Sequence, residues 1–102
     1  MNEPLTINVA GLNYKVVVTE CFKASDDGRN LWGYCDYGNL TIYIRESLSE
    51  ERKQQTLIHE LTHAVFSEAG FTDQDEETVT RLSSVLFQVL KQNPHIFTFN
   101  RE

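Results

Sequence analysis

The stretch from residue 48 to residue 69 constrains the fold more than any other part of the chain, because it contains neither glycine nor proline. Ser47 with Glu50 three residues later matches a capping box at its start, and Gly70 suits the position just past a helix end. We therefore predict a helix over residues 48–69. Its apolar residues recur on one stripe, as is typical of a helix that lies on a sheet: Leu57, Ile58, Leu61, Ala64, Val65 and Ala69.

This helix carries the motif His59-Glu60-Leu61-Thr62-His63. Residues four apart lie on the same face of a helix, so both imidazoles can bind one metal ion. On a helical wheel His59 and His63 fall nearly opposite the apolar stripe, which argues against histidines of the core. Glu60 projects from the neighbouring face, where a carboxylate can take a proton from a water that attacks a carbonyl. The motif predicts zinc binding and peptide-bond hydrolysis; the alternative is a solvent-facing histidine pair without a metal.

A second helix is predicted over residues 73–92, from a capping signal formed by Thr72 and Asp75 to the break at Asn93-Pro94. If the two helices run antiparallel, the start of the second lies close to His63. A zinc enzyme needs a third protein ligand. The candidates are the acidic residues that open this helix and one histidine near the end of the chain: Asp73, Asp75, Glu76, Glu77 and His95.

Position in the expected helical hairpin separates these candidates. His95 would lie at the far end, and Asp75 already has the capping role. Glu77 shares a solvated face with Arg81, whereas Glu76 borders the apolar face. We therefore predict Glu76 as the third ligand, with Glu77 as the alternative. Acidic residues also stabilise a helix N-terminus when no metal is present, so their position alone does not require one.

The first 45 residues predict strands. Four segments are alternating, β-branched or aromatic in character, and Gly38-Asn39 suits a two-residue hairpin between the last two. These segments are residues 5–9, 14–19, 31–37 and 40–44. We expect a small, mostly antiparallel sheet of three or four strands, packed on the motif helix.

The predicted elements define an α+β fold. At 102 residues the chain is expected to be a single domain. Residues 1–45 would form the sheet, and residues 46–102 would form the helical hairpin and a tail. The tail from residue 95 to residue 102 is predicted to be a short strand or a packed extension, because it contains Ile96, Phe97 and Phe99.

Composition argues against several classes of function. The net charge is −6 and no lysine or arginine cluster is present, which argues against direct nucleic-acid binding. The start lacks the pattern of a secretory signal, and nowhere do 18 apolar residues follow one another, so we expect a cytoplasmic protein without a membrane partner. Cys21 and Cys35 lack a CxxC spacing and are expected to be free thiols.

Residues 56–64 and 75–83 resemble the small phage- and prophage-associated zincin-like metallopeptidases of the ImmA/IrrE type, and the similarity covers roughly residues 34–93. The resemblance implies a zincin-like fold in which His59, His63 and Glu76 hold zinc and Glu60 is the catalytic base. It also implies a substrate strand laid along the sheet edge nearest the metal, which in this sequence would be Leu40 to Ile44.

These features together predict a zinc-dependent metalloendopeptidase, with one zinc ion per chain, that acts on a protein or peptide in a bacterial or phage-infected cell. A regulatory protein is one candidate substrate, and a tyrosine (Tyr34, Tyr37 or Tyr43) or His95 would stabilise the oxyanion. The alternative is a metal-stabilised binding module with little turnover, but such a module has no need of Glu60. The sequence defines neither cleavage specificity nor oligomeric state, and sites of this kind also accept iron or manganese.

Overall fold

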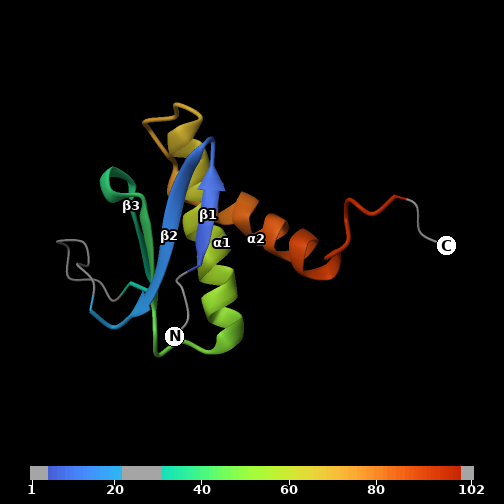
Figure 1. The fold of residues 1–102 in the computed structure, drawn as a ribbon, viewed down its shortest axis with the longest axis horizontal. Helices are drawn as coiled ribbons and strands as arrows, with labels where there is room; N and C mark the ends of the chain where they lie inside the picture. The colour runs from blue at the N-terminus through green and yellow to red at the C-terminus, as the bar shows by residue number, and fades with distance from the viewer. Residues whose placement is uncertain (1–4, 22–30, 100–102) are drawn as a thin grey trace.

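The computed structural model describes residues 5–21 and 31–99 and has the α+β architecture that the sequence predicts (Figure 1). In chain order the elements are β1 (Thr6–Val9), β2 (Leu12–Thr19), β3 (Gly33–Asp36), the 3₁₀ turn η1 (Tyr37–Asn39), β4 (Thr41–Arg45), α1 (Glu50–Glu68) and α2 (Glu76–Gln92). α1 packs on the sheet, and α2 packs on α1. In the described segments, no helix combines the length and apolar character that a bilayer crossing requires.

The sheet is mixed, with its strands in the order β1-β2-β4-β3. The outer pairs, β1 with β2 and β3 with β4, are antiparallel as predicted, but the central pair, β2 with β4, is parallel. The chain leaves β2, forms the outer strand β3 and then returns, so that β4 fits between the two. The sheet is therefore mostly, but not wholly, antiparallel. The parallel pair was not predicted because alternation shows which face a strand buries, not which strands become neighbours.

The connection between β3 and β4 is longer than the predicted two-residue hairpin at Gly38-Asn39. Residues Tyr37–Asn39 form the turn η1, and Leu40 follows with a φ of 51°. The Asp36 carboxylate accepts a hydrogen bond of 3.0 Å from the Asn39 amide, and the Leu40 N–H donates to the Tyr37 carbonyl. These local bonds favour the wider turn.

The hydrophobic core lies between the sheet and α1. Tyr14 and Ala64 are fully buried within it, and Leu57 and Leu61 pack against it from the helix. The Tyr14 hydroxyl donates a hydrogen bond of 2.7 Å to the Glu68 carboxylate. This bond joins β2 to the last turn of α1, so the helix that carries the motif is attached to the sheet at its end as well as along its apolar stripe.

α1 begins two residues later than predicted. Its N-cap is Ser49, whose hydroxyl accepts a hydrogen bond of 3.1 Å from the Arg52 N–H. Ser47 stays outside the helix because its own N–H donates to the Glu20 carboxylate. At the other end Gly70 has a φ of 100°, as expected of a glycine just past a helix end.

α2 crosses α1 obliquely in the antiparallel sense (Figure 1). It begins after Asp75, whose carboxylate accepts a hydrogen bond of 3.1 Å from the Thr78 N–H, so Thr72 is not its cap. Near the other end of α2 the Lys91 ammonium donates to the Gln54 side chain in the first half of α1. α2 packs on α1 over only part of its surface, and several of its apolar side chains are exposed: Leu82, Val85, Leu86 and Leu90.

The chain after α2 forms neither a strand nor a packed extension as far as residue 99. Residues 94–97 form a turn, and the side chains of Phe97 and Phe99 are largely exposed. Figure 1 shows this segment, in red, projecting away from both helices. The prediction for the tail is wrong for residues 95–99, because apolar side chains pack only where another part of the fold offers them a surface. Residues 100–102 lie outside the described part of the chain.

Candidate metal centre

Three side chains predicted as metal ligands meet between the two helices. His59 and His63 stand one turn apart on α1, and Glu76 is the first residue of α2. The His59 Nε2 lies 2.9 Å from one Glu76 carboxylate oxygen, and the His63 Nε2 lies 3.0 Å from the other. The ligand atoms of all three residues lie within 4.8 Å of one another. This spacing suits a single ion, since zinc binds nitrogen and oxygen ligands at about 2.0 to 2.2 Å.

The other candidate ligands do not reach this cluster. The Glu77 carboxylate forms an ion pair of 2.8 Å with Arg81 on the exposed side of α2. Asp75 is used as the helix cap, and His95 lies beyond the C-terminal end of α2. Within residues 5–21 and 31–99, the cluster of His59, His63 and Glu76 is the group of histidine, cysteine and acidic side chains with the spacing for a metal ion.

The two histidines are more enclosed than the helical wheel predicts. Their side chains are 23% and 15% exposed, because α2 covers the side of α1 that faces away from the sheet. Burial lowers the pKa of His59, although the nearby Glu76 carboxylate acts in the opposite direction. A neutral imidazole at His59 is the form that can bind a metal.

Each histidine has a second hydrogen-bond partner that the sequence analysis did not identify. The His63 Nδ1 lies 2.6 Å from the Gln74 Oε1. The His59 Nδ1 lies 3.4 Å from the Ser83 hydroxyl, which itself donates to the Thr80 carbonyl and can therefore accept from the ring. Both partners can accept a hydrogen bond from Nδ1, and that tautomer leaves the Nε2 lone pair of each ring available to an ion held between the rings and the Glu76 carboxylate. Glutamine and serine are too common for their positions alone to have indicated this role.

Glu60 lies on the sheet side of α1 rather than in solvent, with 9% of its surface exposed. Burial raises its pKa to about 7; His63 acts against this rise, and Glu76 adds to it. Gly33 of β3 allows this close packing, because a methyl group at its Cβ position would lie 3.1 Å from the Glu60 Cγ. Glu60 therefore sits next to the proposed ligands, in surroundings that bring its titration close to neutral pH.

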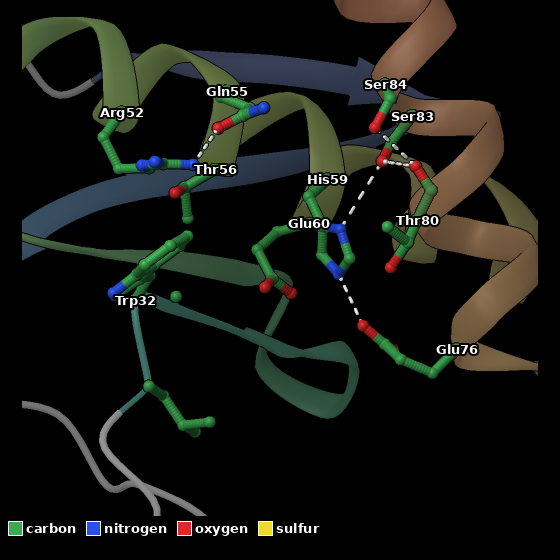
Figure 2. A pocket seen from close by; sticks show the side chains of 12 residues that line it. Trp32, Arg52, Gln55, Thr56, His59, Glu60, Glu76, Thr80, Ser83 and Ser84 are labelled. Carbon is green, nitrogen blue, oxygen red and sulfur yellow. Dashed lines mark hydrogen bonds and ion pairs between the residues drawn. The ribbon is translucent and has the colours of Figure 1, made fainter.

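A pocket of about 430 Å³ opens beside these residues, between β3, α1 and α2 (Figure 2). The strand that borders it is β3, because β4 is paired on both sides. The expectation that Leu40 to Ile44 forms the edge nearest the metal is therefore wrong. The Arg45 N–H donates to the Trp32 carbonyl, so these two residues form a hydrogen-bonded pair of the ladder between β3 and β4. In an antiparallel ladder such pairs alternate with pairs that are not hydrogen-bonded. The backbone N–H and C=O groups of Gly33 and Cys35 therefore point away from β4.

Of the tyrosines predicted near the cleft, Tyr37 lies closest to the centre. It shares a side-chain hydrogen bond with Gln74, and burial raises its pKa to about 12, with Glu60 and Glu76 among the smaller causes. Tyr34 and Tyr43 stack on each other with ring centroids 6.4 Å apart. Because Tyr34 alternates with Gly33 and Cys35, it projects from the sheet face opposite α1. Tyr37 is thus the tyrosine that contacts the site, through Gln74.

Comparison with known protein families relates the chain to one of them. The model of a protein family described as IrrE N-terminal-like domain (Peptidase_M78) matches residues 14–84. This range includes both histidines of the cluster, Glu60 and Glu76. No curated protein and no solved structure matches the chain.

Proposed function

The chain belongs to the IrrE N-terminal-like domain family, and from this we propose that it is a zinc-dependent endopeptidase with His59, His63 and Glu76 as ligands and Glu60 as the catalytic base. The observation that carries the proposal is that the Nε2 atoms of His59 and His63 both lie next to the Glu76 carboxylate. A buried glutamate lies beside them and is not itself a member of that cluster. A structural metal site would leave such a glutamate without a role.

The chemistry of the donor set supports zinc. Two imidazoles and one carboxylate are the ligands of many hydrolytic zinc sites. Bound there, zinc would activate a water molecule and polarise the substrate carbonyl. Gln74 and Ser83 hold the rings through Nδ1, so the ligand atoms are oriented before any ion enters.

Glu60 supplies the proton transfers in this proposal. Its carboxylate accepts a proton from the attacking water and then gives it to the departing amine. Burial raises the pKa of this carboxyl, which favours its uptake of a proton from the water. Burial beneath β3 keeps the carboxylate in one place between the two transfers.

The outer edge of β3 is the proposed binding site for the substrate backbone. The backbone groups of Gly33 and Cys35 face away from β4 and have no strand beside them among residues 5–21 and 31–99, so they can pair with an extended peptide that joins the sheet as an added strand. A methyl group on Gly33 would lie 3.1 Å from the Glu60 Cγ, so a peptide on this edge passes beside the proposed base. A protein or peptide with an accessible extended segment is therefore the substrate class we propose.

The test is a comparison of Glu60→Gln with Glu77→Gln, which removes an exposed acid paired with Arg81. We expect both variants to keep one zinc per chain by atomic absorption. Glu60→Gln should lose cleavage of a quenched-fluorescence peptide library by about 10²- to 10⁴-fold, and Glu77→Gln should retain it. Equal cleavage by wild type and Glu60→Gln, or a wild type that retains no zinc, would contradict the proposal.

A metal-stabilised binding module is the second candidate. It is favoured by the way α2 is attached: Glu76 connects the start of α2 to both histidines of α1, and much of the apolar side of α2 is exposed. A metal at this point would hold the two helices together whether or not turnover occurs. Strong thermal destabilisation by a chelator, combined with no cleavage of any library peptide, would support the module over the enzyme.

A further inference from the structure

The pocket beside the candidate ligands extends along α1 to a second group of side chains, Trp32 and Arg52 (Figure 2). The Arg52 guanidinium carbon lies 4.3 Å from the centre of the Trp32 ring. One of its nitrogens donates to the Gln55 side chain. Figure 2 shows these three residues at one end of the pocket and His59 with Glu76 at the other.

Arg52 has no carboxylate partner among the residues that the structure describes: the ion pairs found there involve Arg45, Arg81 and the two histidines. A guanidinium stacked on an aromatic ring presents its face to the ring and keeps N–H groups on its edge for another acceptor. A neighbouring pocket shares Arg52 and Gln55 and adds Lys91 and Glu51. Of the acids of the first pocket, Glu76 stands at the opposite end and Glu60 lies between the two ends (Figure 2).

The distance between the two ends matches a short extended peptide. Arg52 precedes His59 by seven residues, which is two helical turns or about 10 Å along the helix axis. A strand added to β3 would rise about 3.3 Å per residue. A side chain about three residues from the cleaved bond would therefore reach Arg52.

We propose that Arg52 and Trp32 form a specificity subsite that binds an acidic side chain of the substrate, about three residues from the cleaved bond. This inference rests on the proposed peptidase function, because the distance is counted from the bond that the peptidase would cleave. The carboxylate of the substrate side chain pairs with the edge of the Arg52 guanidinium. The Trp32 ring covers the aliphatic part of that substrate side chain. A substrate carboxyl terminus offers the same chemistry, so the test must separate the two sources.

Trp32 is the only tryptophan in the chain, so its fluorescence reports on the subsite directly. The probes are nine-residue alanine-rich peptides, acetylated and amidated, in which one glutamate occupies each position in turn. Matched peptides carry glutamine instead. A further peptide has a free carboxyl terminus and no glutamate. Each is titrated into the zinc-loaded Glu60→Gln protein, so that binding is measured without turnover.

We expect the best glutamate peptide to bind about five- to tenfold tighter than its glutamine partner. Adding Arg52→Gln should abolish this preference, whereas Lys53→Gln should keep it, since Lys53 lines a different pocket, next to β2. A preference for the free carboxyl terminus instead of an internal glutamate would overturn the assignment to a side chain. Equal binding of all peptides, no fluorescence response, or a preference that survives Arg52→Gln would overturn the subsite.

Incubation of the same peptides with the wild-type protein separates this inference from the proposed function. Arg52-dependent binding without cleavage would contradict the endopeptidase and leave an acidic-peptide site in place. Cleavage that ignores the glutamate would contradict the subsite and leave the endopeptidase in place.

Discussion

Gly33 is the residue at which the edge strand comes closest to the motif helix. A methyl group there would lie 2.6 Å from the Thr56 Cγ2 and 3.0 Å from the Tyr43 carbonyl oxygen, which belongs to the backbone and cannot rotate away. We expect Gly33→Ala to push β3 away from α1 and to lower the free energy of unfolding by about 1 to 3 kcal/mol in urea titrations. Glu60 loses its packing in the same step, so peptide cleavage should fall too.

Gly38 provides the matched control for this substitution. Its nearest atom would be 3.9 Å from an added Cβ, which is ordinary contact. Gly38→Ala should therefore stay within about 0.5 kcal/mol of the wild type. If both variants unfold at the same urea concentration, the close approach at Gly33 does not contribute to the free energy of unfolding.

The two cysteines should differ in reactivity by a large factor. Cys21 is exposed, whereas Cys35 is buried beneath α1. Burial raises the pKa of Cys35 to about 12, and the negative charge of Glu60 adds to the rise. Since only the thiolate reacts, Cys35 should stay unlabelled at neutral and mildly alkaline pH. Iodoacetamide followed by mass spectrometry should show one modification in native protein and two in urea; rapid double labelling of native protein would contradict the burial.

At the scale of the elements, the Asp75 cap makes the stability of α2 depend on pH. Hydrogen bonds from Thr78 hold the pKa of this carboxyl below its ordinary value. Its contribution is therefore fully present above the ordinary aspartate pKa and is lost as the pH falls through the lower, folded-state value. Asparagine caps helices about as well but does not titrate.

Urea midpoints of wild type and Asp75→Asn, measured from neutral pH down to about pH 3, should show this difference. The wild type is expected to lose more stability than Asp75→Asn on acidification, because the other titrating groups are common to both proteins. Parallel curves across the whole range would show that the carboxylate of Asp75 is not stabilised by the fold.

The elements that local patterns determine could be predicted from the sequence, and those that depend on neighbours could not. The α1 helix follows from its own residues, and so does the spacing of His59 and His63. The parallel contact of β2 with β4 does not, because it requires β3 to fold outside β4. That one difference in strand order moved the proposed substrate edge from Leu40–Ile44 to Gly33–Asp36.

In the candidate site, too, some features follow from the residues of one helix and others depend on how the two helices pack. The face that each residue occupies on one helix favours Glu76 over Glu77, and in the structure Glu76 lies beside both histidines while Glu77 pairs with Arg81. The enclosure of the histidines, and their bonds to Gln74 and Ser83, depend on how α2 lies across α1. The apolar pattern of either helix does not predict how the two helices cross.

At the scale of the whole molecule, the proposed metal centre joins the start of α2 to the rest of the fold. α2 packs mainly on α1, and its outer apolar side chains are exposed, so hydrophobic burial contributes less here than in the core. A ligand that binds only the folded state stabilises it by about 2.7 kcal/mol at a hundred times its dissociation constant. For a domain of this size, about 10 °C or more in Tm is therefore expected on adding zinc.

Calorimetry and hydrogen exchange should locate that stabilisation. Zinc should raise the Tm of the wild type and of Glu77→Gln alike, and EDTA should reverse the change. Glu76→Gln should show a much smaller shift, because the carboxylate that links α2 to both histidines is gone. Amide exchange should slow most in the first turns of α2, where the connection is made. If zinc instead protects the sheet and leaves α2 unchanged, or if Glu76→Gln responds as fully as Glu77→Gln, then Glu76 is not the ligand that joins the two helices.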